Sequence, residues 1–90
     1  MIENSYKTSC GSIHYFVNII DKQKITLVFL PGLTADHRLF EKQIEYFEKK
    51  QNVFVWDAPS HALSRPFTNN YSLSDMAEWL DKILTKEEIY

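Results

Sequence analysis

Cysteine, glycine and long apolar runs are the scarce features of this 90-residue sequence. Cys10 is the only cysteine, so an internal disulfide is excluded, which fits a reducing compartment. The two glycines belong to neither a G-x-x-x-x-G-K-[ST] loop nor a G-x-G-x-x-G dinucleotide motif. No apolar run approaches the roughly 20 residues that span a bilayer, and Met1 is not followed by a signal peptide. These absences favour a soluble, cytoplasmic protein without a membrane partner.

An excess of charge of one sign is also missing. The formal net charge of -2 leaves no basic surface for nucleic acid, which we therefore exclude as a main partner. With 44% apolar and 24% charged residues the composition is that of a globular chain, and its length suits one small domain. The histidines and the cysteine lack any recognised ligand spacing, so no metal site is predicted. Those residues are Cys10, His14, His37 and His61.

The first third of the chain predicts a β-hairpin. Residues 2–8 read as a weak strand, and Cys10-Gly11-Ser12 is a turn signal. Residues 13–20 alternate, with Ile13, Tyr15 and Val17 on one face and His14 and Phe16 on the other. Such alternation is typical of a half-buried strand, so the two segments should pair in antiparallel fashion.

The middle of the chain predicts a parallel βαβ unit. Residues 25–30 and 53–56 are apolar on both faces, as expected of strands that are covered on both sides. Between them, apolar residues recur at helical spacing over about 36–50, and Asn52 can close that helix. Two strands joined through a helix should be parallel.

A second helix is predicted from residue 72 onwards. Ser72 and Asp75 have the spacing of a capping box. An apolar stripe runs from Leu73 to Leu84 and requires a sheet to cover it. The fold class is therefore α/β: an antiparallel hairpin leading into a parallel βαβ unit, with two helices.

Two loops at the carboxyl ends of the predicted parallel strands can carry chemistry, because ligands of such sheets bind there. We call residues 31–37 the Gly32 loop and residues 57–66 the Asp57 loop. The Gly32 loop runs from a strand to a helix start, where free N–H groups suit an oxyanion or a phosphate. Gly32 allows a ligand to approach the backbone closely. Taken alone, Pro31-Gly32 favours a simple turn over a ligand site.

Both loops together resemble the α/β-hydrolase family. The family has a buried strand that ends in His-Gly, and residues 27–33 are similar to it with Leu-Val-Phe-Leu-Pro-Gly-Leu. It also has a strand that ends in Asp-x-Pro-Gly-His-Gly-x-Ser, and residues 53–66 are similar to it with Val-Phe-Val-Trp-Asp-Ala-Pro-Ser-His-Ala-Leu-Ser-Arg-Pro. The resemblance covers nearly the whole chain, most strongly residues 25–84. Pro31 stands in place of the family's histidine, and Ser60 and Ala62 replace two glycines. The nucleophile motif G-x-S-x-G is absent, so this resemblance implies residues 1–90 are one partial domain that ends before the catalytic serine.

The resemblance also implies roles for the loop residues. The Leu33 amide, beside Gly32, corresponds to an oxyanion donor. Thr34, Asp36 and His37 line the entrance of the site, or else Thr34 or Asp36 caps the helix and His37 is exposed. A carboxylate and a hydroxyl can satisfy nearby backbone amides, so we expect a bracing role in the Asp57 loop for Asp57, His61, Ser64 and Arg65. His61 does not match the family's catalytic histidine, which comes last in the chain, and no cofactor is implied.

The leading functional hypothesis is the N-terminal portion of a serine hydrolase that acts on an ester, thioester or amide, with a small acyl compound as substrate. The alternative is a stand-alone, non-catalytic α/β module that binds an anion or a protein at the Gly32 loop. In the family, the nucleophile strand pairs with the free side of the strand matching residues 25–30. We therefore expect residues 25–30 to form an edge strand open to self-association, and the stripe beginning at Leu73 to be partly uncovered.

Overall fold

The computed structural model describes residues 1–32, 35–59, 62–65, 67 and 71–89. In chain order its elements are β1 (Ile2–Lys7), β2 (Ser12–Asn18), β3 (Thr26–Phe29), the 3-10 helix η1 (His37–Phe40), α1 (Glu41–Phe47), β4 (Asn52–Trp56), the 3-10 helix η2 (Ala62–Ser64) and α2 (Leu73–Lys86). None of these helices combines the length and the apolar character needed to cross a membrane.

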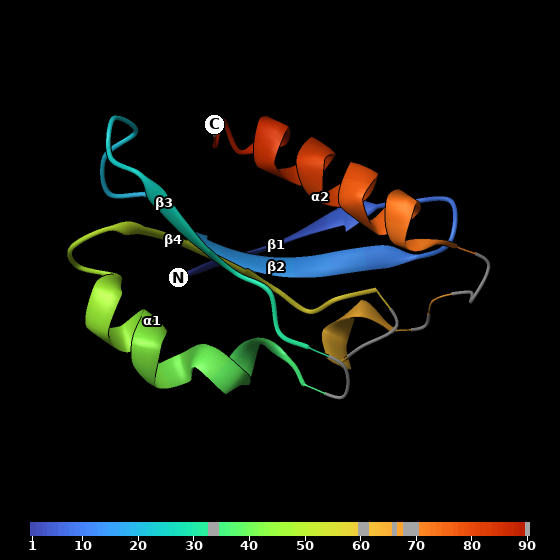
Figure 1. The fold of residues 1–90 in the computed structure, drawn as a ribbon, viewed down its shortest axis with the longest axis horizontal. Coiled ribbons are helices and arrows are strands. Elements are labelled where there is room, and N and C mark those ends of the chain that lie inside the picture. The colour runs from blue at the N-terminus through green and yellow to red at the C-terminus, as the bar shows by residue number, and fades with distance from the viewer. Residues whose placement is uncertain (33–34, 60–61, 66, 68–70, 90) are drawn as a thin grey trace.

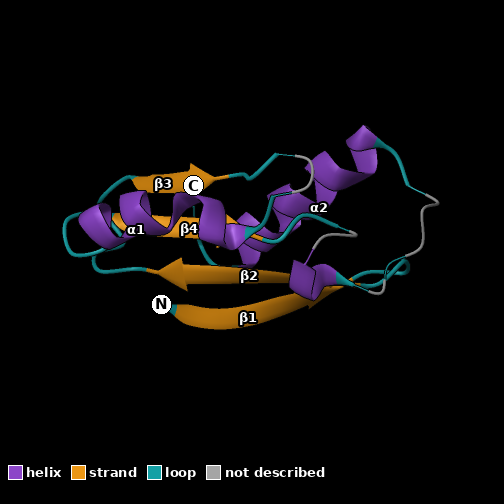
Figure 2. Ribbon diagram, turned by 90° about the horizontal axis from the view of Figure 1, so that it is seen from below, coloured by secondary structure: helices purple, strands orange, loops and turns teal. Residues whose placement is uncertain are grey.

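The four strands form one mixed sheet in the order β1-β2-β4-β3 (Figure 2). β1 and β2 are an antiparallel hairpin in which Tyr6 lies opposite Ile13. β2 continues antiparallel to β4, and β4 is parallel to β3 with Val28 opposite Phe54. The predicted hairpin, the parallel pair and the edge position of residues 25–30 are all confirmed.

The two helices cover opposite faces of the sheet, with α2 on one side and α1 on the other (Figure 1). Alternation along β2 sends Ile13, Tyr15 and Val17 into the core beneath α2, where Ile83 is fully buried. Phe16 points to the other face and packs with the smaller cluster around Ile44 of α1. The period-two pattern of one strand therefore divides the core into two layers.

The two parallel strands differ in burial although their sequences are similar. Every residue of β4 is buried, because β4 has a strand on each side and a helix over each face. No residue of β3 reaches that degree of burial, and 37% of Val28 is exposed. The expectation that residues 25–30 would be covered on both faces is therefore wrong, because Leu27 and Phe29 pack with the cluster of Ile44 on the α1 face while Val28 on the other face stays partly exposed.

The helix expected over 36–50 begins with a 3-10 segment and is shorter than its apolar spacing suggested. Asn52 does not close it, because the last helical turn is capped by the Glu48 amide, which donates to the Ile44 carbonyl at 2.8 Å. Instead Asn52 begins β4, is 1% exposed and binds the turn before β3. The side-chain oxygen of Asn52 accepts hydrogen bonds from the backbone amides of Ile20 and Asp21, and its side-chain NH2 group donates to the backbone carbonyls of Asp21 and Lys24. The burial of a polar side chain is thus matched by four hydrogen bonds.

α2 has the predicted start. The Ser72 side chain accepts from the Asp75 amide at 3.2 Å, and the Asp75 carboxylate accepts from the Ser72 amide at 2.9 Å. The apolar stripe is covered unevenly, since Ile83 is 0% exposed and Leu73 is 81% exposed. The partly uncovered stripe expected from the sequence is therefore confirmed.

The C-terminal end of α2 is fastened to β2 through a buried phenol. The Tyr15 hydroxyl donates to the Glu87 carboxylate at 2.5 Å, and Asn4 of β1 donates to the same oxygen. Burial raises the pKa of Tyr15 well above its usual range, and the hydrogen bond and charge of Glu87 raise it further.

We predict that this contact makes stability decline in alkaline solution. The pKa of Tyr15 is higher in the folded protein than in the unfolded chain, where it is about 10. Its contribution to the free energy of unfolding is therefore complete below about pH 10 and diminishes as the pH rises above the pKa of the unfolded chain. Tyr15→Phe should lose about 1 kcal/mol at neutral pH and flatten the alkaline decline. Urea unfolding from pH 7 to 11 measures both effects. Tyr46→Phe, which changes an exposed ring, is the matched control. If Tyr15→Phe left the dependence of stability on pH unchanged, the alkaline decline would not come from Tyr15.

Candidate functional site

The Gly32 and Asp57 loops lie at the same end of the sheet, because β3 and β4 are parallel and each loop follows one of them. The described parts of the loops are 31–32, 35–37, 57–59 and 62–65. Leu33, Thr34 and His61 lie outside the described residues, so the roles expected of them stay predictions.

A buried carboxylate joins the two loops. Asp57 is 0% exposed and accepts from the His37 amide at 2.8 Å and from His37 Nδ1 at 2.7 Å. Its second oxygen accepts from the Leu63 amide at 3.3 Å. A carboxylate removed from water is costly unless donors surround it, and these three N–H groups serve that purpose.

The contact also determines how the His37 ring is held. An ionised carboxylate can only accept hydrogen bonds, so Nδ1 carries a proton whether the imidazole is neutral or charged. The ring packs against Phe16 with centroids 4.3 Å apart. His37 is therefore partly buried and anchored, and the exposed His37 of the capping alternative is wrong. The short sequence motifs gave no signal for this pair, whose members are 20 positions apart.

Ser64 fastens the Asp57 loop to the hairpin. Its buried hydroxyl donates to the Asp57 carbonyl at 2.5 Å and accepts from the His14 amide at 2.8 Å. The Asp57 amide in turn donates to the His14 carbonyl at 2.9 Å. Three segments, β2, the Asp57 loop and the start of η1, are thus connected through Asp57. Arg65, the fourth residue with an expected bracing role, is exposed.

Asp36 is the N-cap of η1. Its carboxylate accepts from the Arg38 amide at 2.9 Å and forms an exposed ion pair with the Arg38 guanidinium at 2.6 Å. Hydrogen bonding to Arg38 lowers the pKa of Asp36 to about 2. Asp36 and Asp57 together occupy the first two amides of the helix, those of residues 37 and 38. An anion at this end of the sheet must therefore use loop amides upstream of the helix, not the helix start.

Gly32 leaves open space at its backbone. An added Cβ would meet nothing within 4 Å, and the residue does not adopt a positive φ angle. A larger side chain at this position would therefore not strain the backbone, whose conformation is accessible to any residue type. The Ala35 amide donates to the Gly32 carbonyl at 3.1 Å and closes the loop on itself.

Two hollows flank His37. One of about 400 Å³ is lined by Asp36, His37, Arg38, Leu63 and Arg65. A second of about 190 Å³ lies on the apolar side, beside Phe16, Ile44 and Val55. The larger hollow has the size of a small-molecule site, roughly 300–1,000 Å³. Among the described residues no three His, Cys, Asp or Glu side chains are grouped to hold a metal ion.

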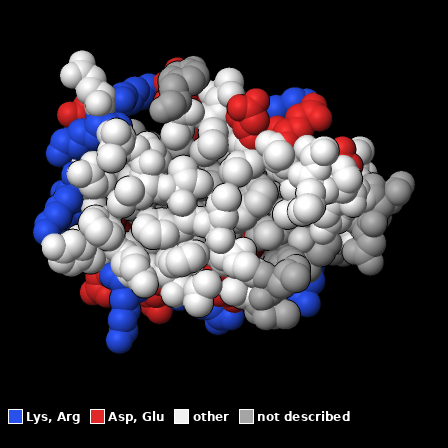
Figure 3. Space-filling view, in the orientation of Figure 1, with Lys and Arg blue, Asp and Glu red and all other residues white. Residues whose placement is uncertain are grey.

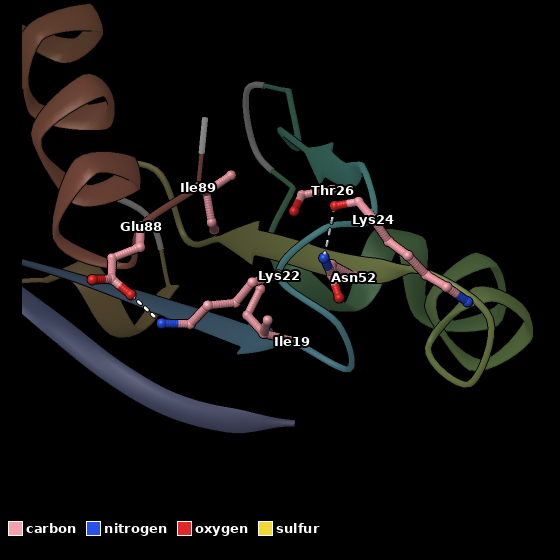
Figure 4. Close-up of a pocket in the computed structure, with 7 residues that line it drawn as sticks. All are labelled: Ile19, Lys22, Lys24, Thr26, Asn52, Glu88 and Ile89. Atoms are coloured by element: carbon pink, nitrogen blue, oxygen red, sulfur yellow. Dashed lines mark hydrogen bonds and ion pairs between the residues drawn. The ribbon is translucent and has the colours of Figure 1, made fainter.

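A third pocket lies at the opposite end of the sheet and is separate from the loops (Figure 4). Its volume is about 70 Å³, room for little more than water. The ion pair between Lys22 and Glu88 and the bond between Asn52 and the Lys24 carbonyl link the turn before β3 to α2 and β4 (Figure 4). These contacts explain the pocket as a structural junction.

Comparison with known proteins identifies the fold. None of the curated proteins matches the sequence. Among solved structures, 1H-3-hydroxy-4-oxoquinoline 2,4-dioxygenase is similar with a TM-score of 0.79 and 21% identity, over 96% of this chain and 32% of that one. A membrane phospholipase A, described as a bacterial virulence factor, is similar with a TM-score of 0.74 and 20% identity, over 93% of this chain and 27% of that one.

The chain therefore spans about a third of the length of the structures that it resembles. At these identities the likeness concerns the fold alone. The family model described as the alpha/beta hydrolase fold matches residues 25–88, which include both loops. Since that match covers more than half of the sequence, the chain belongs to the α/β-hydrolase fold family.

Proposed function

We propose that this chain is the N-terminal portion of a serine hydrolase and supplies its oxyanion loop. The observation that carries the proposal is the buried Asp57, which ties the His37 end of the Gly32 loop to the end of β4. A donor stabilises a developing oxyanion only if it is held in place before the reaction. A loop fastened at both ends, by β3 and by Asp57, meets that requirement.

The substrate class follows from the chemistry of an oxyanion hole. Such donors act on the tetrahedral intermediate of acyl transfer, so an ester, thioester or amide is the expected substrate. The nucleophile, acid and base would come from residues outside this sequence, which contains no G-x-S-x-G. In the resemblance, Leu33 and Gly32 form the hole, while Thr34, Asp36 and His37 line its entrance.

A non-catalytic α/β module that binds an anion or a protein is the second candidate. This candidate requires no nucleophile and only the backbone of the Gly32 loop as a binding site. The fold does not decide between the two, because one similar structure is a dioxygenase and another a phospholipase. A reading frame that continues into G-x-S-x-G and a late histidine would support the hydrolase.

We predict that the 90-residue chain has no acyl-transfer activity. It has a candidate oxyanion loop, but its sequence lacks the G-x-S-x-G nucleophile motif. The purified chain should neither hydrolyse p-nitrophenyl acetate above background nor react with a serine-directed fluorophosphonate. Stoichiometric labelling of one serine would overturn this prediction.

The Gly32 loop is tested by separating backbone from side-chain effects. Gly32→Val should leave the unfolding of the 90-residue chain unchanged, because the space around an added Cβ is open. In the complete enzyme the same substitution should lower kcat by about 10²–10³, since the branched side chain obstructs the approach to the oxyanion donor. Leu33→Ala, the control, should retain most activity. Normal turnover by Gly32→Val would show that this loop is not the oxyanion hole.

The anchoring role of Asp57 predicts a loss of stability. Asp57→Asn removes the charge that three N–H groups solvate, and should cost about 1–3 kcal/mol. Amides 37 and 63 should then exchange with solvent faster, as measured by NMR. Asp36→Asn, at the half-buried cap of η1, is the matched control and should change stability by less than about 1 kcal/mol. Equal effects of the two substitutions would contradict a special role for Asp57.

A further inference from the structure

The imidazole of His37 has one occupied and one open nitrogen. Nδ1 lies 2.7 Å from the buried Asp57 carboxylate, whereas Nε2 makes no hydrogen bond with any residue that the structure describes. In the described part of the chain, His14 Nδ1 is the one buried polar side-chain atom without a partner, so His37 Nε2 is not buried. Since 27% of the His37 side chain is exposed, this nitrogen is accessible to a ligand.

The surroundings of the His37 ring determine what the open nitrogen can do. Because the ionised Asp57 holds a proton at Nδ1, Nε2 of the neutral ring carries a lone pair and can only accept a hydrogen bond. Stacking against Phe16 and the short contact with Asp57 oppose rotation of the ring. His37 therefore presents a fixed acceptor, and a ligand opposite it must supply a hydroxyl or N–H group.

Arg38, the next residue, offers donors to the same hollow of about 400 Å³. Its Nε and Nη2 bind the Asp36 carboxylate, whereas Nη1 makes no hydrogen bond to the part of the chain that the structure describes. A guanidinium has five N–H donors, and 74% of the Arg38 side chain is exposed, so it can bind a further acceptor. Charges of both signs lie along the lower rim of the face in Figure 3, on the side where Figure 1 places η1 and η2. The region is therefore polar.

We propose that this hollow binds a small carboxylate that also carries a hydroxyl group. The hydroxyl donates to His37 Nε2, and the carboxylate accepts from the Arg38 guanidinium, whose planar donors match it. Leu63, which is 46% exposed, lines the same hollow and supplies apolar surface for the carbon frame. Arg65 lines it as well, so the hollow has two guanidinium groups and one carboxylate, that of Asp36.

The location agrees with the topology of the fold. The hollow lies at the carboxyl ends of the parallel strands β3 and β4, where ligands of α/β sheets bind. Its two walls, the start of η1 and the Asp57 loop, are tied together by the Asp57 carboxylate. The proposed contacts include neither a nucleophile nor an oxyanion donor. Binding can therefore be measured on this chain whether or not the proposed acyl transfer holds.

Matched ligands test the hydroxyl contact. 4-Hydroxybenzoate should bind the purified chain in the millimolar range and shift the NMR signals of backbone amides 37, 38, 63 and 65. Benzoate and 4-methoxybenzoate, which lack the donor, should both bind about tenfold more weakly, the loss expected for one hydrogen bond. 4-Hydroxybenzamide, which lacks the charge, should also bind more weakly. Absence of binding, or equal affinities for 4-hydroxybenzoate and benzoate, would overturn the proposal.

Substitutions assign the two contacts to their side chains. His37→Asn removes Nε2, while the asparagine NH2 group can donate to Asp57 in place of Nδ1. The preference for 4-hydroxybenzoate over benzoate should then disappear. Arg38→Gln should weaken both ligands, and Lys24→Gln, which removes a positive charge at the opposite end of the sheet, should weaken neither. A preference that survives His37→Asn, or equal effects of Arg38→Gln and Lys24→Gln, would refute the assignment.

Nitrogen NMR of the His37 ring gives a result that needs no ligand and no variant. At about pH 8, where histidine side chains are ordinarily uncharged, Nδ1 should give the signal of a protonated nitrogen and Nε2 that of an unprotonated one. If His37→Asn fails to fold, this measurement and the matched ligands decide. A protonated Nε2 with a bare Nδ1 would make the open nitrogen a donor and would overturn the proposal.

Discussion

The buried carboxylate of Asp57 is the interaction on which the arrangement of the loops depends. It lies fully out of solvent at the end of β4, and three N–H groups from two other segments converge on it. An unpaired charge at that depth would strongly favour unfolding. The Gly32 loop and η2 must therefore fold back onto β4 together, so the position of a candidate oxyanion loop is coupled to the integrity of the core.

The same end of the sheet shows why a helix start is not automatically an anion site. The dipole and the free amides at the beginning of η1 would attract a negative group. The protein supplies those groups itself, since Asp36 caps the Arg38 amide and Asp57 binds the His37 amide. The backbone upstream, at the exposed Gly32, remains open to a ligand. Two carboxylates of the protein itself thus occupy the amides at the start of η1.

β4 and β3 illustrate how topology gives different environments to similar sequences. Both strands are apolar on both faces, yet β4 lies between two strands and β3 at an edge. The chain belongs to the α/β-hydrolase fold family, and among the described residues its β3 combines the apolar sequence of a central strand with an edge position. The two similar structures described above are about three times longer than this chain.

Local sequence determined the hairpin, the parallel pair and the capping box of α2, because alternation, apolar runs and cap spacing act between near neighbours. It also indicated which loops follow the parallel strands. Only the tertiary structure brought His37 and Asp57 together. It also decided that the Asn52 side chain binds the turn before β3 and does not cap a helix. Those partners are distant in the chain, and a polar side chain finds them only after burial has removed water as the alternative.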